Sequence, residues 1–183
     1  MKKILLAVTC AAMVIMAASC GKDKVKDISE IERISPDKLI TAESVSAITG
    51  VTMEIDENGV TNDGSARSVT YVPSPVGSAD PVTIRIEQFS ETLTTTQVWA
   101  DYENSRIRRE DMEFVEGIGQ DCYIAYPYIN VYDRGCFIRI SAGSGDNDDQ
   151  KELLKSLAAA AAVEVETIIP AETVEAASSN VIK

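Results

Sequence analysis

Short segments that alternate apolar and polar residues are the feature that most restricts the fold of this chain. The clearest covers residues 82–89, where aliphatic side chains at alternate positions fall on one side of an extended backbone and polar ones on the other. Residues 51–56 alternate in the same way, and residues 66–72 form another extended segment. Such strands bury only one face. The chain therefore requires a sheet with one side against a core.

The second half of the chain contains a run of closely spaced strands. They are predicted at residues 121–126, 128–132 and 136–142. Pro127 separates the first two strands, and an Asp-Arg-Gly turn separates the second from the third. A shorter strand is predicted just before them, at residues 112–115. Because strands joined by short turns pair with opposite directions, we expect an antiparallel meander.

Three helices are predicted, at residues 41–50, 94–109 and 149–163. Thr41 is a suitable N-cap for the first, and Gly50 can adopt the left-handed conformation that ends it. Helices must cover at least one face of the sheet because the strands are half apolar. The predicted fold is α+β, a mainly antiparallel sheet with helices packed on it, in the order helix, three strands, helix, four strands, helix.

The N-terminus has the pattern of an export signal. Lys2 and Lys3 precede an uncharged apolar stretch at residues 4–18, and small residues lead directly to Cys20. This arrangement resembles the lipobox of bacterial lipoproteins, although Ala17 stands where leucine is commonest. The resemblance implies removal of residues 1–19 and attachment of diacylglycerol to the Cys20 sulfur. Two alternatives are an ordinary secretory signal that leaves Cys20 a free thiol, and a retained membrane anchor.

The rest of the chain divides into three parts. Residues 20–38 mix charges of both signs and are predicted to be a tether, and residues 39–163 form one domain. Residues 164–183 are small and polar and are predicted to be disordered. The domain resembles small bacterial lipoprotein domains of unknown function near the PsbP-like α/β fold. That resemblance rests on its opening helix (39–50), on residues 115–123, on Gly135 with the strand at 137–140, and on its alanine-rich last helix.

Charge and composition exclude several classes of function. The sequence has 17 basic and 29 acidic residues, a net charge of −12, and no histidine. Imidazole-dependent catalysis and histidine-ligated metals are therefore excluded. The acidic balance argues against nucleic acid as a partner. The acidic loops near Asp56 and Asp146 lack the spacing of a calcium-binding EF-hand, so we predict neither a metal nor a cofactor.

Cys122 and Cys136 are the only cysteines in the predicted domain. An extracytoplasmic compartment would permit a disulfide between them. If the strand at residues 128–132 lies between their strands, the two cysteines are too far apart to bond. If the strands are ordered differently, they could pair. A catalytic role is not expected because no histidine is present to activate either thiol.

Tyr128 and Tyr132 are predicted to share one face of their strand. Tyrosines on an exposed sheet can form a surface that binds peptides or sugars. Alternatively, the two side chains cover the sheet beneath a helix, which is the interpretation we favour. Their exposure in the structure discriminates between a binding module and a mainly structural lipoprotein.

These observations favour a binding or accessory lipoprotein, not an enzyme, anchored by lipid on the extracytoplasmic side of the cell membrane. Its partner would be another envelope protein or a small exported ligand. The alternative is an envelope hydrolase that uses carboxylates. A pocket in which acids of raised pKa converge would support that alternative.

Overall fold

The computed structural model describes residues 33–90, 93–107, 109–171 and 173–174. The predictions for the signal sequence, for Cys20 and for most of the tether fall outside these residues. The described helices include none that is long and apolar enough to cross a membrane.

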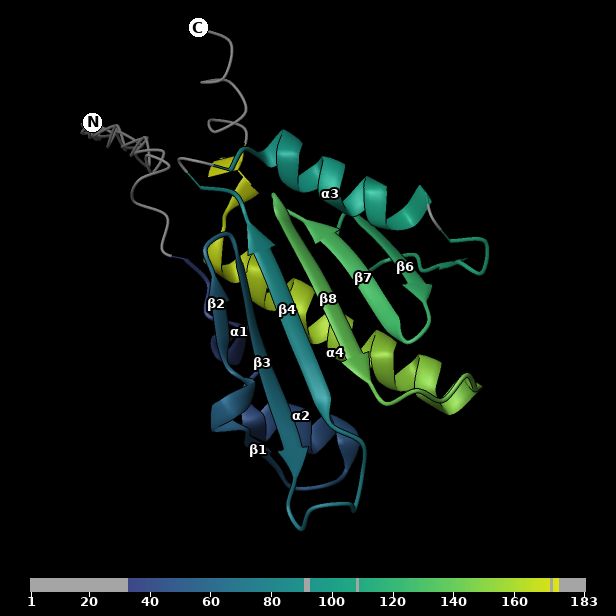
Figure 1. The fold of residues 1–183 in the computed structure, drawn as a ribbon. Coiled ribbons are helices and arrows are strands. Elements are labelled where there is room, and N and C mark those ends of the chain that lie inside the picture. The colour runs from purple at the N-terminus through teal and green to yellow at the C-terminus, as the bar shows by residue number, and fades with distance from the viewer. Residues whose placement is uncertain (1–32, 91–92, 108, 172, 175–183) are drawn as a thin grey trace, which may run out of the picture.

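One eight-stranded antiparallel sheet forms the centre of the molecule (Figure 1). The strands lie in the order β1-β3-β4-β8-β7-β6-β5, and β2 pairs with β3 beside β1. Their bounds are β1 (Met53–Ile55), β2 (Thr61–Asp63), β3 (Ala66–Pro73), β4 (Val82–Gln88), β5 (Glu113–Phe114), β6 (Asp121–Ala125), β7 (Tyr128–Asp133) and β8 (Cys136–Ala142). The predicted meander is confirmed as β6-β7-β8.

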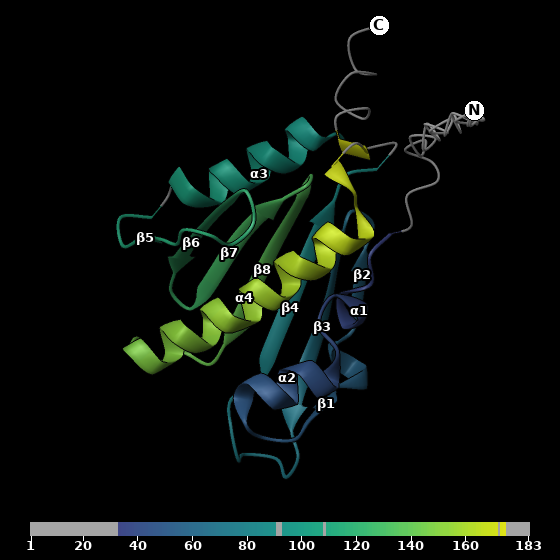
Figure 2. The same cartoon turned by 180° about the vertical axis from the view of Figure 1, so that it is seen from behind.

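The helices lie on both faces of the sheet. They are α1 (Pro36–Leu39), α2 (Ala42–Thr49), α3 (Thr95–Ile107) and α4 (Asp148–Ile168), and a 3₁₀ turn, η2, covers Glu57–Gly59. Figure 2 shows α1, α2 and α4 against one face, and in Figure 1 α3 lies along one end of the opposite face. The predicted α+β class is confirmed, and the order differs by an additional short helix and strand before β3.

Local sequence signals account for the ends of the helices. Thr41 caps α2, since its side chain accepts a hydrogen bond from the Ser44 amide. Gly50 follows in the left-handed conformation, with φ of 72°, as its position predicted. Asn147 caps α4 by accepting from the Gln150 amide.

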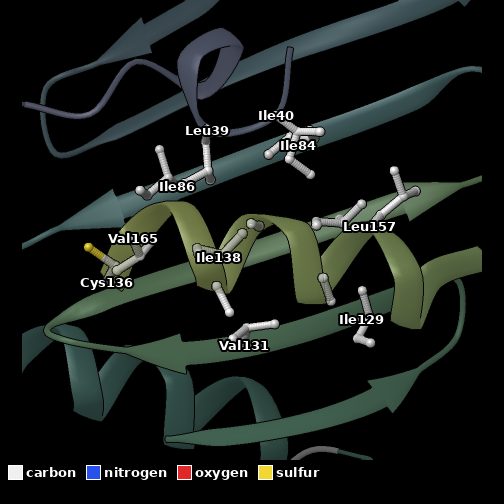
Figure 3. Close-up of a cluster of buried hydrophobic side chains, with 14 of the residues drawn as sticks. Leu39, Ile40, Ile84, Ile86, Ile129, Val131, Cys136, Ile138, Leu157 and Val165 are labelled. Atoms are coloured by element: carbon white, nitrogen blue, oxygen red, sulfur yellow. The ribbon is translucent and has the colours of Figure 1, made fainter. Parts of the chain in front are cut away.

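The main core lies between α4 and the sheet. Ile84 and Ile86 of β4 and Ile138 of β8 lie in one cluster with Leu157 of α4, and all four side chains are fully buried (Figure 3). Full burial of one such side chain contributes about 1.5–3 kcal/mol to folding. The apolar sides of the alternating strands therefore face α4, as their sequence requires.

The structured domain extends beyond both predicted boundaries. Ile34 is buried before the expected start at residue 39, and α4 continues to Ile168 instead of ending at Val163. Val165 and Ile169 are fully buried. Arg134 donates from Nη1 to the Ile169 carbonyl at 2.8 Å. The turn between β7 and β8 thus supplies a partner for the end of α4, a contact that the sequence pattern does not reveal.

Replacing Ile169 by alanine tests this extension. We expect the Ile169→Ala substitution to lower the free energy of unfolding by about 2–4 kcal/mol, because it leaves a cavity in a packed core. Val163→Ala is the control, since Val163 is 64% exposed on α4, shortly before Ile169. Chemical denaturation measures both. If both substitutions lowered the free energy of unfolding by the same small amount, the residues after Val163 would not be part of the core.

Candidate functional site

The two faces of the sheet differ in how they are covered. The face beneath α1, α2 and α4 is filled by aliphatic side chains. On the opposite face, α3 covers one end, and the remaining surface of β3, β4 and β8 is not covered by any described helix (Figure 1). The site must therefore be sought on this second face or in a cavity at the rim.

Beneath α3 lies a cluster of five aromatic rings from the helix and the sheet: Trp99, Tyr102, Tyr123, Tyr132 and Phe137. The ring centres of Trp99 and Tyr132 are 4.7 Å apart, and those of Tyr102 and Tyr123 are 5.3 Å apart. Aromatic rings at these distances stabilise one another beyond the area they bury. Burial here raises the pKa of the Tyr132 phenol. The cluster therefore attaches α3 to the sheet.

The structure separates the two tyrosines that the sequence placed together. Tyr132 belongs to the cluster beneath α3, whereas Tyr128, at the other end of β7, lies next to Arg139 of β8. The Arg139 guanidinium carbon is 5.3 Å from the centre of the Tyr128 ring and 5.2 Å from that of Phe137. Both side chains lie on the same face of β7, as predicted, and the packing of α3 on Tyr132 agrees with the favoured interpretation for that residue. Tyr128 alone remains available to a partner.

The strand register arranges polar side chains in rows across the uncovered surface, which we call the open face. One row contains Thr70, Thr83, Ser141 and Tyr128, and the next contains Ser68, Arg85 and Arg139. Thr70 and Thr83 share a hydrogen bond of 3.1 Å. Sequence alternation identified the polar side of β4, but the rows depend on which strands are neighbours.

The two cysteines are buried, and both thiols are free. Strand β7 lies between their strands, and the register offsets them further, because Cys122 is opposite Val131 and Cys136 is opposite Asp133. Two strand spacings are about 9–10 Å, beyond the reach of a disulfide. Burial raises the pKa of the Cys122 thiol to about 12 and that of Cys136 well above its usual range. Neither thiol is therefore a nucleophile near neutral pH.

A cavity of about 250 Å³ lies at the turn between β7 and β8. Asp133 lines it with only 2% of its surface exposed, and its Oδ2 atom has no hydrogen-bond partner. Burial raises the pKa of this carboxyl from 3.8 to about 6. Glu166 lies at the rim, 3.8 Å from the Arg134 guanidinium, with 55% of its side chain exposed. Sequence reasoning missed Asp133 because nothing in the local pattern shows its burial.

This cavity offers limited catalytic chemistry. Its one acid of raised pKa is Asp133, whereas Glu166 is exposed and ion-paired with arginine. Small-molecule sites usually enclose about 300–1,000 Å³. Within the part of the chain that the structure describes, no three acidic or cysteine side chains are placed to hold a metal ion.

Asp133 gives the protein a predictable pH dependence of stability. Its folded-state pKa of about 6 exceeds the ordinary value of 3.8, so its stabilising contribution is complete below about pH 4 and is lost as the pH rises through 6. Among the described residues, Arg134, Glu166, Tyr132 and Cys136 are ionisable groups that interact with it. Asp133→Asn should remove this loss, which amounts to at most about 3 kcal/mol.

Denaturation at several pH values between 4 and 8 measures the effect. The unfolding free energy of the wild type should fall more steeply with pH than that of the Asp133→Asn variant. Asp63→Asn, at an exposed position of β2, serves as a control and should keep the wild-type slope. If the unfolding free energy changed with pH equally in all three proteins, the raised pKa of Asp133 would be wrong.

Alkylation tests the state of the cysteines. We expect iodoacetamide at pH 7.5 to leave Cys122 and Cys136 unmodified in the native protein, because both are buried thiols. In denaturant without reductant, both should react completely. Peptide mass spectrometry distinguishes the sites. Modification that requires a reductant would instead demonstrate a disulfide.

Comparison of the chain with protein-family models, with curated proteins and with solved structures finds no match. The resemblances to lipobox lipoproteins and to PsbP-like domains therefore remain predictions from the sequence.

Proposed function

We propose that this protein is a lipid-anchored lipoprotein on the extracytoplasmic side of the cell membrane, and that it binds another envelope protein through the open face. The signal-like N-terminus ending at Cys20 supports the location. The observation that carries the binding role is the uncovered sheet surface around Tyr128 and Arg139.

The shape of this surface favours a protein over a small ligand. It is the face of a sheet, and its side chains are hydroxyl, arginine and tyrosine groups spread over β3, β4, β7 and β8. The cavities beside Asp133 and beside Arg33 measure about 250 and 210 Å³, below the usual size of small-molecule sites. A broad, shallow surface suits a partner that is itself a macromolecule.

The composition of the open face separates this role from a purely structural one. An antiparallel sheet can leave one face in water without any function. Tyrosine and arginine, however, are the residues that most often dominate binding energy at protein interfaces. Tyr128 and Arg139 occupy adjacent strands of this face, and the Arg139 guanidinium packs against the Tyr128 ring.

A carboxylate-dependent hydrolase is the second candidate. Its support is the buried Asp133 carboxyl with its raised pKa. Catalysis by two carboxylates needs a second acid whose pKa is also perturbed. Glu166, the other acid at this cavity, is exposed and paired with Arg134, which argues against a hydrolase.

In-cell crosslinking of the membrane-bound protein tests the proposal. We expect one envelope protein to be captured, and we expect Thr83→Trp to abolish its capture because the indole would stand in the middle of the open face. Val163→Trp, on the exposed side of α4, should capture normally. Thermal unfolding confirms that both variants fold. Undiminished capture by folded Thr83→Trp would refute docking on this face.

A further inference from the structure

Arg139 is held in a fixed position on the open face. Its Nε atom donates to Asn130 Oδ1 at 3.0 Å, and its guanidinium lies between the rings of Tyr128 and Phe137. Stacked and hydrogen-bonded guanidinium groups lose less side-chain entropy when they bind than mobile ones do. The remaining N–H groups of Arg139 make no hydrogen bond or ion pair within the described parts of the chain.

A second arginine lies directly opposite. The register pairs Arg85 of β4 with Arg139 of β8. Side chains so paired have Cβ atoms about 4.5–5.5 Å apart, and like charges in that relation destabilise a sheet. Arg85 is paired with Glu87 at 2.7 Å, and no described acid contacts Arg139. The pair therefore carries one positive charge more than its surroundings neutralise.

This local excess contrasts with the rest of the molecule. The chain has 29 acidic and 17 basic residues, so acidic partners for an arginine are abundant. A juxtaposed arginine pair that keeps one member without an acid has a cost in folding stability. The contacts of Arg139 with Asn130, Tyr128 and Phe137 hold its side chain but do not neutralise its charge. A negatively charged group from another molecule would remove that cost.

We propose that Arg85 and Arg139 together form a carboxylate-binding site, at which an acidic segment of the partner protein docks on the open face. This inference rests on the proposed function and specifies its partner. Arg139 presents its planar N–H edge for a two-point interaction with a carboxylate, and the Thr83 and Ser141 hydroxyls lie in the adjacent row. The hydrogen bond from Arg85 to the Glu87 carboxylate shows that this surface accommodates a side-chain carboxylate.

Titration with short peptides tests the site. The full-length chain in detergent micelles is titrated with a tetraglutamate peptide and with a tetraglutamine peptide as a neutral control. We expect only tetraglutamate to shift the NMR signal of the Arg139 Nε–H group, and we expect the affinity to fall with added salt. Arg139→Gln and Arg85→Gln should each weaken binding at least about fivefold, as loss of a charge-assisted contact predicts.

Stability measurements separate this result from misfolding. Arg85→Gln should unfold at the same temperature as the wild type or higher, since it relieves the like-charge pair. Lys155→Gln removes the same charge from α4 on the other side of the sheet and should leave peptide binding unchanged. If Lys155→Gln weakened peptide binding as much as the arginine variants do, net charge alone would explain the loss of affinity, and the proposed site would be wrong. Equal response to tetraglutamine, or saturation by inorganic phosphate but not by tetraglutamate, would also overturn it.

The two proposals fail in different ways. If Thr83→Trp abolishes crosslinking to the envelope partner while Arg85→Gln and Arg139→Gln retain both crosslinking and peptide binding, the open face docks a partner and the carboxylate site is wrong. If Thr83→Trp crosslinks normally, docking on this face is wrong irrespective of what the peptides bind.

Discussion

The pairing of β4 with β8 is the contact on which the rest of the structure depends. It joins the first four strands to the last four, over seven residue pairs from Val82 with Ala142 to Gln88 with Cys136. Without it, each half would be a small sheet with an unpaired edge. Helix α4 then packs over this junction, so that aliphatic side chains from both halves share one core (Figure 3). The joining of the two halves of the sheet and the burial of its apolar face therefore depend on the same region of the structure.

The unequal covering of the sheet connects the fold with the proposed function. One long helix and two short ones fill the α4 side, whereas a single helix of 13 residues covers only an end of the other side. The aromatic cluster that holds α3 also fixes Phe137, and Phe137 in turn packs against Arg139. The same packing that stabilises the fold thus positions the arginine of the proposed site.

How much of the site could be predicted is clear from Tyr128 and Tyr132. Alternation correctly placed both on the polar side of β7, but it could not show that α3 crosses above Tyr132 and stops short of Tyr128. The same limit applies to Cys122 and Cys136, for which both strand orders were open until the structure placed β7 between them. Asp133 and the Arg85–Arg139 pair were not found, because they arise from contacts between residues distant in the sequence.

The sequence by itself determined the class of the fold, most of the strands and helices, the capping of α2 by Thr41, and an acidic composition without histidine. These properties depend on local periodicity, on backbone preferences and on composition, all of which can be read directly from the sequence. Only the tertiary structure decided the junction of β4 with β8, the length of α4 beyond Val163, and the burial of Asp133. Each of these depends on free energy gained when segments far apart in sequence come into contact. A local sequence pattern does not identify which distant segment it will contact.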